Sequence, residues 1–306
     1  MRALFPYLSR MPALPEVIGP IARRAKKTNW LPKGLRQSVG EACARHLALP
    51  AYVRRFSTSA GGVQFTLGSR PRVSLVGYAY YQGLEEFEPN TIALFAALAK
   101  TARTVVDVGA NIGIFSLVAA GVRPQSRILA FEPQPMVAMS LARNVAFSEA
   151  SNVEVFPAAL GSAIGYAALY TTVSDVLSSM DRARVPDAIK LIVPATTLDE
   201  IANEKNVVDV DLVKIDAEGW ELQVLEGAAS TLERDRPTVL FEALADSPAA
   251  AITALFSGLD YDIWVIAEGR IERVDLCSAA GKANERNFVA IPKERSDQVL
   301  ELPVDW

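Results

Sequence analysis

The amino-acid sequence predicts an α/β fold built on a doubly wound, mostly parallel sheet of seven strands. From residue 104 onward, short apolar runs rich in β-branched residues alternate with segments of helical periodicity. A glycine-rich turn follows the first of these runs, and half of the 306 residues are hydrophobic, which is enough for a sizeable core. In such sheets ligands bind beyond the carboxyl ends of the strands, so the residues just after each strand are the candidates for function.

The chain before residue 104 predicts a hairpin and one helix. Gly62–Leu67 and Arg72–Tyr78 have the composition of strands, and Gly68-Ser69-Arg70-Pro71 would form the turn between them. A helix is expected over Pro89–Lys100, where apolar residues recur at helical spacing.

Strands and helices then alternate along the chain. The seven expected strands of the sheet are Thr104–Val108, Arg127–Phe131, Val153–Ala159, Asp211–Asp216, Thr238–Ala243, Tyr261–Ala267 and Asn287–Pro292. The helices expected between them are Ile112–Ala120, Met136–Phe147, Gly219–Arg234 and Ala249–Leu259. The last two strands are expected to be antiparallel, because no clear helix separates them. Between Gly161 and Pro194 the alternation breaks, and the extended segments Tyr166–Thr172 and Leu191–Ala195 indicate an insertion near a binding face.

Charge divides the chain into a basic N-terminal extension, residues 1–60, and a domain over residues 61–306. Residues 1–40 carry eight basic side chains and one acidic one, although the whole chain has a net charge of −4. The extension is either a solvated lid or a patch that touches an anionic membrane surface or an acidic acceptor. We expect residues 1–60 and the insertion together to cover the acceptor pocket, since substrate loops often lie outside the regular elements.

Composition excludes several classes of protein. The small net charge gives no global argument for a nucleic-acid partner. Cys43 and Cys277 lie far apart without metal-ligand spacing, and the single histidine, His46, cannot build a histidine metal site. Neither a signal peptide nor an apolar run of membrane-spanning length is apparent, so a cytoplasmic protein is expected, with peripheral membrane contact through residues 1–40 as the second alternative.

The turn after the first strand reads VDVGANIG at residues 106–113. Gly109 allows a sharp backbone turn, and Gly113 lets the following helix pack closely. A dinucleotide fingerprint would be G-x-G-x-x-G, but its first glycine is replaced here by Asp107. A carboxylate at that position would repel a pyrophosphate and suits a ligand with an ammonium or sulfonium group.

The second strand ends at Glu132, 23 residues beyond Gly109. An acidic residue at about 20 residues past the glycine turn is placed to accept hydrogen bonds from both hydroxyls of a ribose.

Four blocks of sequence together resemble the FkbM family of S-adenosylmethionine (SAM)-dependent methyltransferases. They are YQGLEEFEP at 81–89, VDVGANIG at 106–113, FEP at 131–133 with LARNV at 141–145, and TLD at 197–199 followed by LVKIDAEGWE at 212–221 and VLEGA at 224–228. The resemblance covers about residues 80–245. It implies a Rossmann-like class I methyltransferase fold, in which Asp107, Gly109, Asn111 and Glu132 hold SAM, with Gly113 in the same turn. It also implies methyl transfer to a hydroxyl of a sugar, a glycan or a natural product. No acid follows the third strand, so adenine contacts would be apolar or made by the backbone.

The block around Lys214 supplies the candidate catalytic residues. Lys214 and Asp216 point to one face of a central strand, where a lysine is costly unless it is paired. Glu218 and Glu242 follow at the ends of the same and the next strand. One of Asp216 and Glu242 would bind or deprotonate the acceptor hydroxyl, with Lys214 and Glu218 in support; the competing interpretation is a structural ion pair. A divalent cation is disfavoured, because the sequence offers only two carboxylates, Asp216 and Glu242, as plausible ligands.

Two other functions remain open from the sequence: an NAD-linked oxidoreductase on a similar sheet, and a methyltransferase-like module that only binds a partner. The missing first glycine disfavours NAD, and the intact glycine turn with Glu132 disfavours loss of activity. The sequence names neither the acceptor, beyond a small molecule or glycan, nor the oligomeric state.

Overall fold

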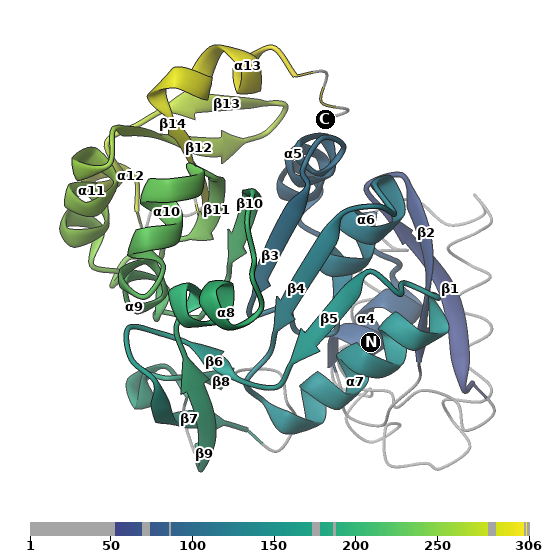
Figure 1. Cartoon of the computed structure of the whole chain (residues 1–306). Coiled ribbons are helices and arrows are strands. Elements are labelled where there is room, and N and C mark those ends of the chain that lie inside the picture. The colour runs from purple at the N-terminus through teal and green to yellow at the C-terminus, as the bar shows by residue number, and fades with distance from the viewer. Residues whose placement is uncertain are drawn as a thin grey trace, which may run out of the picture.

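The computed structural model describes residues 53–68, 74–85, 87–172, 178–185, 188–280, 286–302 and 304, and these form an α/β fold with one large sheet (Figure 1). The strands of this sheet are β3 (Thr104–Val108), β4 (Arg127–Phe131), β5 (Val153–Phe156), β10 (Val210–Ile215), β11 (Thr238–Glu242), β12 (Tyr261–Ala267), β13 (Arg270–Arg273) and β14 (Asn287–Pro292). Their order across the sheet is β13-β12-β14-β11-β10-β3-β4-β5. Residues 1–52, which include the basic segment, Cys43 and His46, lie outside the described residues.

The pairing of the strands confirms the mostly parallel, doubly wound sheet. Strands β5, β4, β3, β10 and β11 are parallel neighbours, whereas β14 runs antiparallel to both β11 and β12. All seven expected strands are present, but the expected number is wrong because β13 adds an eighth at the edge. This strand follows a tight turn at Gly269 (φ 72°) and is largely exposed, so it lacks the apolar pattern that marks buried strands.

Helices cover both faces of the sheet and enclose two apolar cores. One face carries α5 (Pro89–Ala99), α6 (Ile114–Val122) and α7 (Pro135–Phe147), and the other carries α8 (Leu198–Glu204), α9 (Glu221–Glu226), α10 (Ala229–Asp235) and α11 (Ala249–Gly258). Alternate residues of one strand feed the two cores, as Val105 and Val106 do in β3. The single helix expected over Gly219–Arg234 is instead α9 followed by α10. The helix is interrupted at Gly227, where a Cβ atom would lie 1.9 Å from the Gly161 carbonyl oxygen.

The expected N-terminal hairpin is wrong in its pairing. The strands are β1 (Arg55–Ala60) and β2 (Val63–Gly68), and Ser74–Tyr81 is a helix, α4. Gly61 and Gly62 both have positive φ and form the two-residue turn typical of hairpins. This Gly-Gly pair is the sequence feature that indicates pairing of β2 with the segment before it rather than with the segment after it. The expected boundary at residue 60 falls at this turn.

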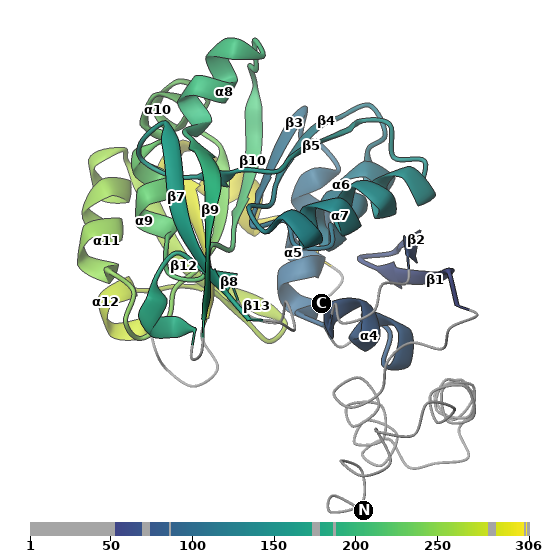
Figure 2. The ribbon, with the colours of Figure 1, turned by 90° about the horizontal axis from the view of Figure 1, so that it is seen from below.

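The insertion after β5 forms a second, four-stranded sheet. Its strands are β6 (Ala159–Leu160), β7 (Gly165–Thr171), β8 (Ser178–Ser179) and β9 (Ile189–Thr196), in the order β6-β9-β7-β8. Figure 1 shows this sheet beyond the carboxyl ends of β4 and β5, and Figure 2 shows β7 and β9 standing in front of the main sheet. The short elements that complete the chain are η1 (Arg182–Arg184), α12 (Leu276–Ala279), η2 (Lys293–Arg295) and α13 (Ser296–Leu300). Among the described residues, no helix has both the length and the apolar character that a membrane span requires.

Candidate active site

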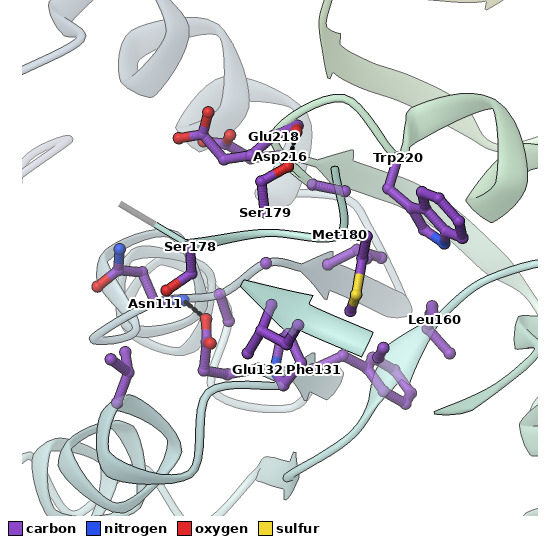
Figure 3. Close-up of a pocket in the computed structure, with 18 of the residues that line it drawn as sticks. Asn111, Phe131, Glu132, Leu160, Ser178, Ser179, Met180, Asp216, Glu218 and Trp220 are labelled. Atoms are coloured by element: carbon purple, nitrogen blue, oxygen red, sulfur yellow. Dashed lines mark hydrogen bonds between the residues drawn. The ribbon is translucent and has the colours of Figure 1, made fainter. Parts of the chain in front are cut away.

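A pocket lies at the carboxyl ends of β3, β4 and β10, with the insertion on its other side (Figure 3). Backbone and side chains of the turn after β3 line it together with Glu132, and Asp216 and Glu218 line it from the end of β10. Ser178, Ser179 and Met180 come from the insertion. The pocket therefore lies at the place where a doubly wound sheet is expected to bind a ligand.

The turn after β3 is shaped by three residues with positive φ. Gly109 (φ 73°) packs so closely against the end of β10 that a Cβ atom would lie 1.8 Å from the Asp216 carbonyl oxygen. Asn111 (φ 51°) also adopts the left-handed conformation and lines the pocket. Gly113 (φ 92°) does not line the pocket; a Cβ atom there would lie 2.4 Å from Leu141 Cδ1 of α7, so this glycine serves helix packing.

Glu132 joins this turn to the end of β4. The Asn111 backbone amide donates to Glu132 Oε2 at 2.9 Å, and the Gln134 amide donates to Oε1 at 2.8 Å. Burial raises the pKa of Glu132 to about 7, against the opposing effect of these two hydrogen bonds. Each carboxylate oxygen accepts one backbone amide and keeps a further lone pair for a ligand in the pocket.

Asp107 lies beneath the turn rather than in the pocket wall. It is buried, and its Oδ2 accepts hydrogen bonds from the Ser116 amide at 3.0 Å and the Ser116 hydroxyl at 2.6 Å. Burial raises the pKa of Asp107 to about 6. The side chain thus anchors the start of α6, and its carboxylate adds negative charge under the pocket floor.

Lys214 carries a fully buried ammonium group next to Asp107 in the sheet. Its Nζ lies 3.3 Å from Asp216 Oδ2 and 5.0 Å from the centre of the Phe115 ring, and 1% of the side chain is exposed. Lys214 also stands opposite Asp107 in the register between β10 and β3. Burial lowers the pKa of Lys214, but the carboxylates of Asp216, Glu88 and Asp107 outweigh this, and the net shift is upward.

Asp216 and Glu218 line the other end of the pocket, and Glu242 lies beside them. Oxygens of Asp216, Glu218 and Glu242 all lie within 4.8 Å of one another. Burial and the charge of Asp216 raise the pKa of Glu218 to about 7 and that of Glu242 to about 8. At neutral pH the cluster therefore holds at least one proton, and Asp216 is the member with an adjacent ammonium. Sequence reasoning placed Asp216 and Glu242 together; the structure adds Glu218 as a third oxygen ligand should a cation bind.

Sequence reasoning did not single out Glu88, although it lies inside the first family block. Glu88 precedes α5 with a left-handed backbone (φ 41°), lines the pocket and contacts Asn287. The apolar end of the pocket was also not predicted from the sequence. Phe131 stacks on Phe156 with ring centres 4.6 Å apart, and Leu160, Met180 and Trp220 lie nearby (Figure 3).

Comparison with known proteins places this geometry in a family. The methyltransferase sdnD of Sordaria araneosa is 32% identical over 153 residues, covering 40% of this chain and 59% of that protein. Methyltransferase 1 of Beauveria bassiana is 30% identical over 142 residues, covering 40% of this chain and 57% of that protein. The chain thus spans less than two thirds of the length of these curated relatives.

A solved structure of methyltransferase FkbM from Methylobacillus flagellatus is 18% identical, with a TM-score of 0.41, and covers 62% of this chain and 43% of that one. The family model described as the methyltransferase FkbM domain matches residues 107–263, just over half of the sequence. The glycine turn, Glu132 and the Asp216–Glu218–Glu242 cluster all lie within the matched residues, and the chain belongs to the FkbM methyltransferase family.

Proposed function

We propose that this chain transfers a methyl group from SAM to a hydroxyl of a small-molecule or glycan acceptor, such as a sugar or a natural product. One observation carries the proposal: a single pocket joins the Gly109–Asn111 turn and Glu132 to the carboxylates of Asp216 and Glu218. The first group of residues suits the cofactor, and the second lies where an acceptor would meet the methyl group.

The residues of the pocket fit SAM. The turn at Gly109 brings backbone close to the ligand without a side chain, and the free lone pairs of Glu132 suit the two ribose hydroxyls. Phe131, Leu160 and Met180 offer an apolar surface for adenine without an acidic partner. The carboxylates around the pocket favour a positively charged ligand. When bound, SAM supplies a methyl group on a sulfonium whose sulfur leaves as a neutral thioether.

The protein's own tasks are then alignment and removal of a proton. We assign proton removal to Asp216, because Lys214 lies 3.3 Å away and compensates its negative charge. Asp216 keeps the proton that it takes from the acceptor hydroxyl, while Glu242 and Glu218, whose pKa values are raised, hold the acceptor by hydrogen bonds. Lys214 supports the reaction from beneath the pocket.

The direct test is S-adenosylhomocysteine formation across a panel of hydroxyl acceptors, with calorimetric binding of SAM and NAD measured in parallel. SAM binding with turnover of a hydroxyl acceptor supports the proposal. Binding of NAD without SAM would favour an oxidoreductase, and SAM binding without turnover of any acceptor would favour a binding module.

Replacing Glu132 with alanine is expected to weaken SAM binding by about 1–3 kcal/mol, since a charged hydrogen-bond acceptor is lost. Isothermal titration calorimetry measures this directly. Glu154→Ala is the matched control, because Glu154 lies on neighbouring β5 and pairs with Lys205 and Arg127 away from the pocket. An unchanged affinity in a folded Glu132→Ala protein would rule out the ribose contact.

Replacing Glu242 with glutamine is expected to stabilise the protein at pH 8.5 and to change little at pH 5.5. Folding raises the pKa of Glu242 from an ordinary value of 4.5 to about 8, mainly through burial. The protonated carboxyl thus stabilises the fold at low pH, and this contribution is lost as the pH rises toward 8. Glutamine cannot ionise and avoids the loss. We expect the free energy of unfolding of the variant to exceed that of wild type by about 1–3 kcal/mol at pH 8.5, a value reduced for the partial exposure of this side chain.

Thermal unfolding of wild type and variant at both pH values checks the expectation. Glu226→Gln is the control, because Glu226 is exposed on α9 and lies outside the carboxylate cluster. A Glu242→Gln effect of equal size at both pH values would show that the ionisation of Glu242 is not coupled to folding.

A further inference from the structure

A second cavity adjoins the carboxylate end of the pocket. It is lined by Glu88, Pro89, Asn90, Thr91, Ile266, Arg286 and Asn287. Glu88 lines both cavities and stands at their junction. Asn287 opens β14 and is the register partner of Glu242 across the antiparallel pair of β11 and β14. The second cavity therefore begins beside the cluster to which we assign proton removal.

The side chain of Glu88 is held at this junction by a strained backbone and a polar contact. Its φ of 41° is left-handed, a conformation that a glutamate adopts only at a cost, and such residues gather at functional sites. Asn287 Nδ2 donates to Glu88 Oε2 at 3.4 Å, a long hydrogen bond that leaves most of the carboxylate's acceptor capacity free.

The charges around Glu88 indicate which ligands the junction accepts. Lys214 already faces Asp107, Asp216 and Glu88, so among the described residues that line the second cavity the only cation left for an anionic ligand is Arg286, which is exposed. An anion would also meet the carboxyl group of Glu88, which lines the same cavity. A neutral hydroxyl both donates and accepts, which matches carboxylate acceptors next to the amide donors of Asn90 and Asn287.

We propose that this second cavity is the acceptor subsite, and that Glu88 and Asn287 bind a neutral hydroxyl adjacent to the one that is methylated. Glu88 accepts a hydrogen bond from that neighbouring hydroxyl, and the Asn287 amide donates to its oxygen. The reacting hydroxyl then points back over Glu88 toward Asp216 and Glu242. Acceptors with two adjacent hydroxyls are thereby selected over those with one. The inference rests on the proposed function and deepens it by assigning acceptor-binding residues.

Ligand-observed NMR titrations of the protein saturated with S-adenosylhomocysteine test the subsite without turnover. The probes are methyl pyranosides of gluco, galacto, manno and rhamno configuration, the corresponding deoxy analogues that lack one of the paired hydroxyls, and glucose 6-phosphate. Glu88→Gln and Asn287→Ala are each expected to weaken binding of the best methyl pyranoside by about tenfold or more, with S-adenosylhomocysteine affinity unchanged. Wild type should bind the deoxy analogue more weakly than the parent pyranoside by a similar factor. The two variants should bind the deoxy analogue and the parent pyranoside with nearly equal affinity.

Glu204→Gln and Asn203→Ala are the matched controls, because both residues are exposed on α8 and line neither cavity. The subsite is overturned by wild-type affinity in both Glu88→Gln and Asn287→Ala, by equal losses in the controls, or by tighter binding of glucose 6-phosphate than of the neutral pyranosides. Failure of every pyranoside to bind a protein that does bind S-adenosylhomocysteine also overturns it. Failure to bind S-adenosylhomocysteine itself would instead contradict the proposed function.

Discussion

Replacing Asp216 with asparagine is expected to lower turnover by about 10²–10⁴-fold, with SAM affinity and melting temperature little changed. Asp216 lines the pocket at the end of β10, within 4.8 Å of Glu218 and Glu242. Asparagine has the same shape and still offers an oxygen to Lys214, but it cannot take a proton from an acceptor hydroxyl. The loss should therefore appear in the chemical step.

The competing account of Asp216 is a structural partner of Lys214. Asp216 keeps 32% of its side chain exposed, and Glu88 and Asp107 also act on the Lys214 charge. Removing one of three carboxylates leaves the buried ammonium compensated, so the structural cost of this substitution should be small. The catalytic account therefore predicts lost turnover with retained stability, whereas a structural ion pair predicts lost stability with retained turnover.

S-adenosylhomocysteine formation at saturating acceptor, SAM calorimetry and thermal unfolding separate these accounts. Asp209→Asn is the control, since Asp209 precedes the same strand at its opposite end and pairs with Arg103 at the surface. Turnover that survives in a folded Asp216→Asn protein would remove the catalytic assignment. A large fall in melting temperature with intact turnover would make the pair structural.

Local pattern predicted most of the main sheet because its strands are buried and its turns are short. Gly109 and Glu132 could be brought together from sequence since the carboxyl ends of adjacent parallel strands meet at one edge. The same argument places Asp216 and Glu242 at that edge. The predictions failed where tertiary packing decides, as at Gly227, where the approach of Gly161 ends α9.

The residues missed at the site depend on contacts distant in sequence. Glu88 reaches the pocket because a left-handed residue turns the chain before α5, and Asn287 meets it from 199 positions away. Asp107 was predicted to bind the cofactor, but its hydrogen bonds to Ser116 in α6 place its side chain under the floor of the pocket. Neither position follows from spacing along the chain, since each is fixed by how α5 and α6 pack on the sheet.

Replacing Lys214 with methionine is expected to lower the free energy of unfolding by about 3–5 kcal/mol at pH 8. Methionine fills a similar volume against Phe115 but leaves Asp107, Asp216 and Glu88 without their shared cation. Asp107 and Glu88 are largely buried, and their raised pKa values already reflect the cost of holding charge there. Uncompensated negative charge in the sheet should therefore dominate the loss.

The destabilisation should shrink at pH 5.5, and the sign follows from the carboxylates. The pKa of Lys214 is raised above its ordinary 10.5, so its own stabilising contribution is constant between pH 5.5 and 8. Asp107, with a pKa near 6, takes up a proton in that interval, and its pKa rises further once the cation is gone. Protonation removes the repulsion that the variant would otherwise carry, so the variant should recover part of its stability in acid.

Urea unfolding of the Lys214→Met protein at the two pH values measures this difference. Lys205→Met is the control, because Lys205 is 42% exposed and pairs with Glu154 at the surface, where such pairs contribute about 0–1 kcal/mol. A Lys214→Met protein as stable as wild type at pH 8 would mean that the carboxylates are neutral without the lysine. The cluster would then lack the fixed negative charge on which the assignment of Asp216 as proton acceptor depends.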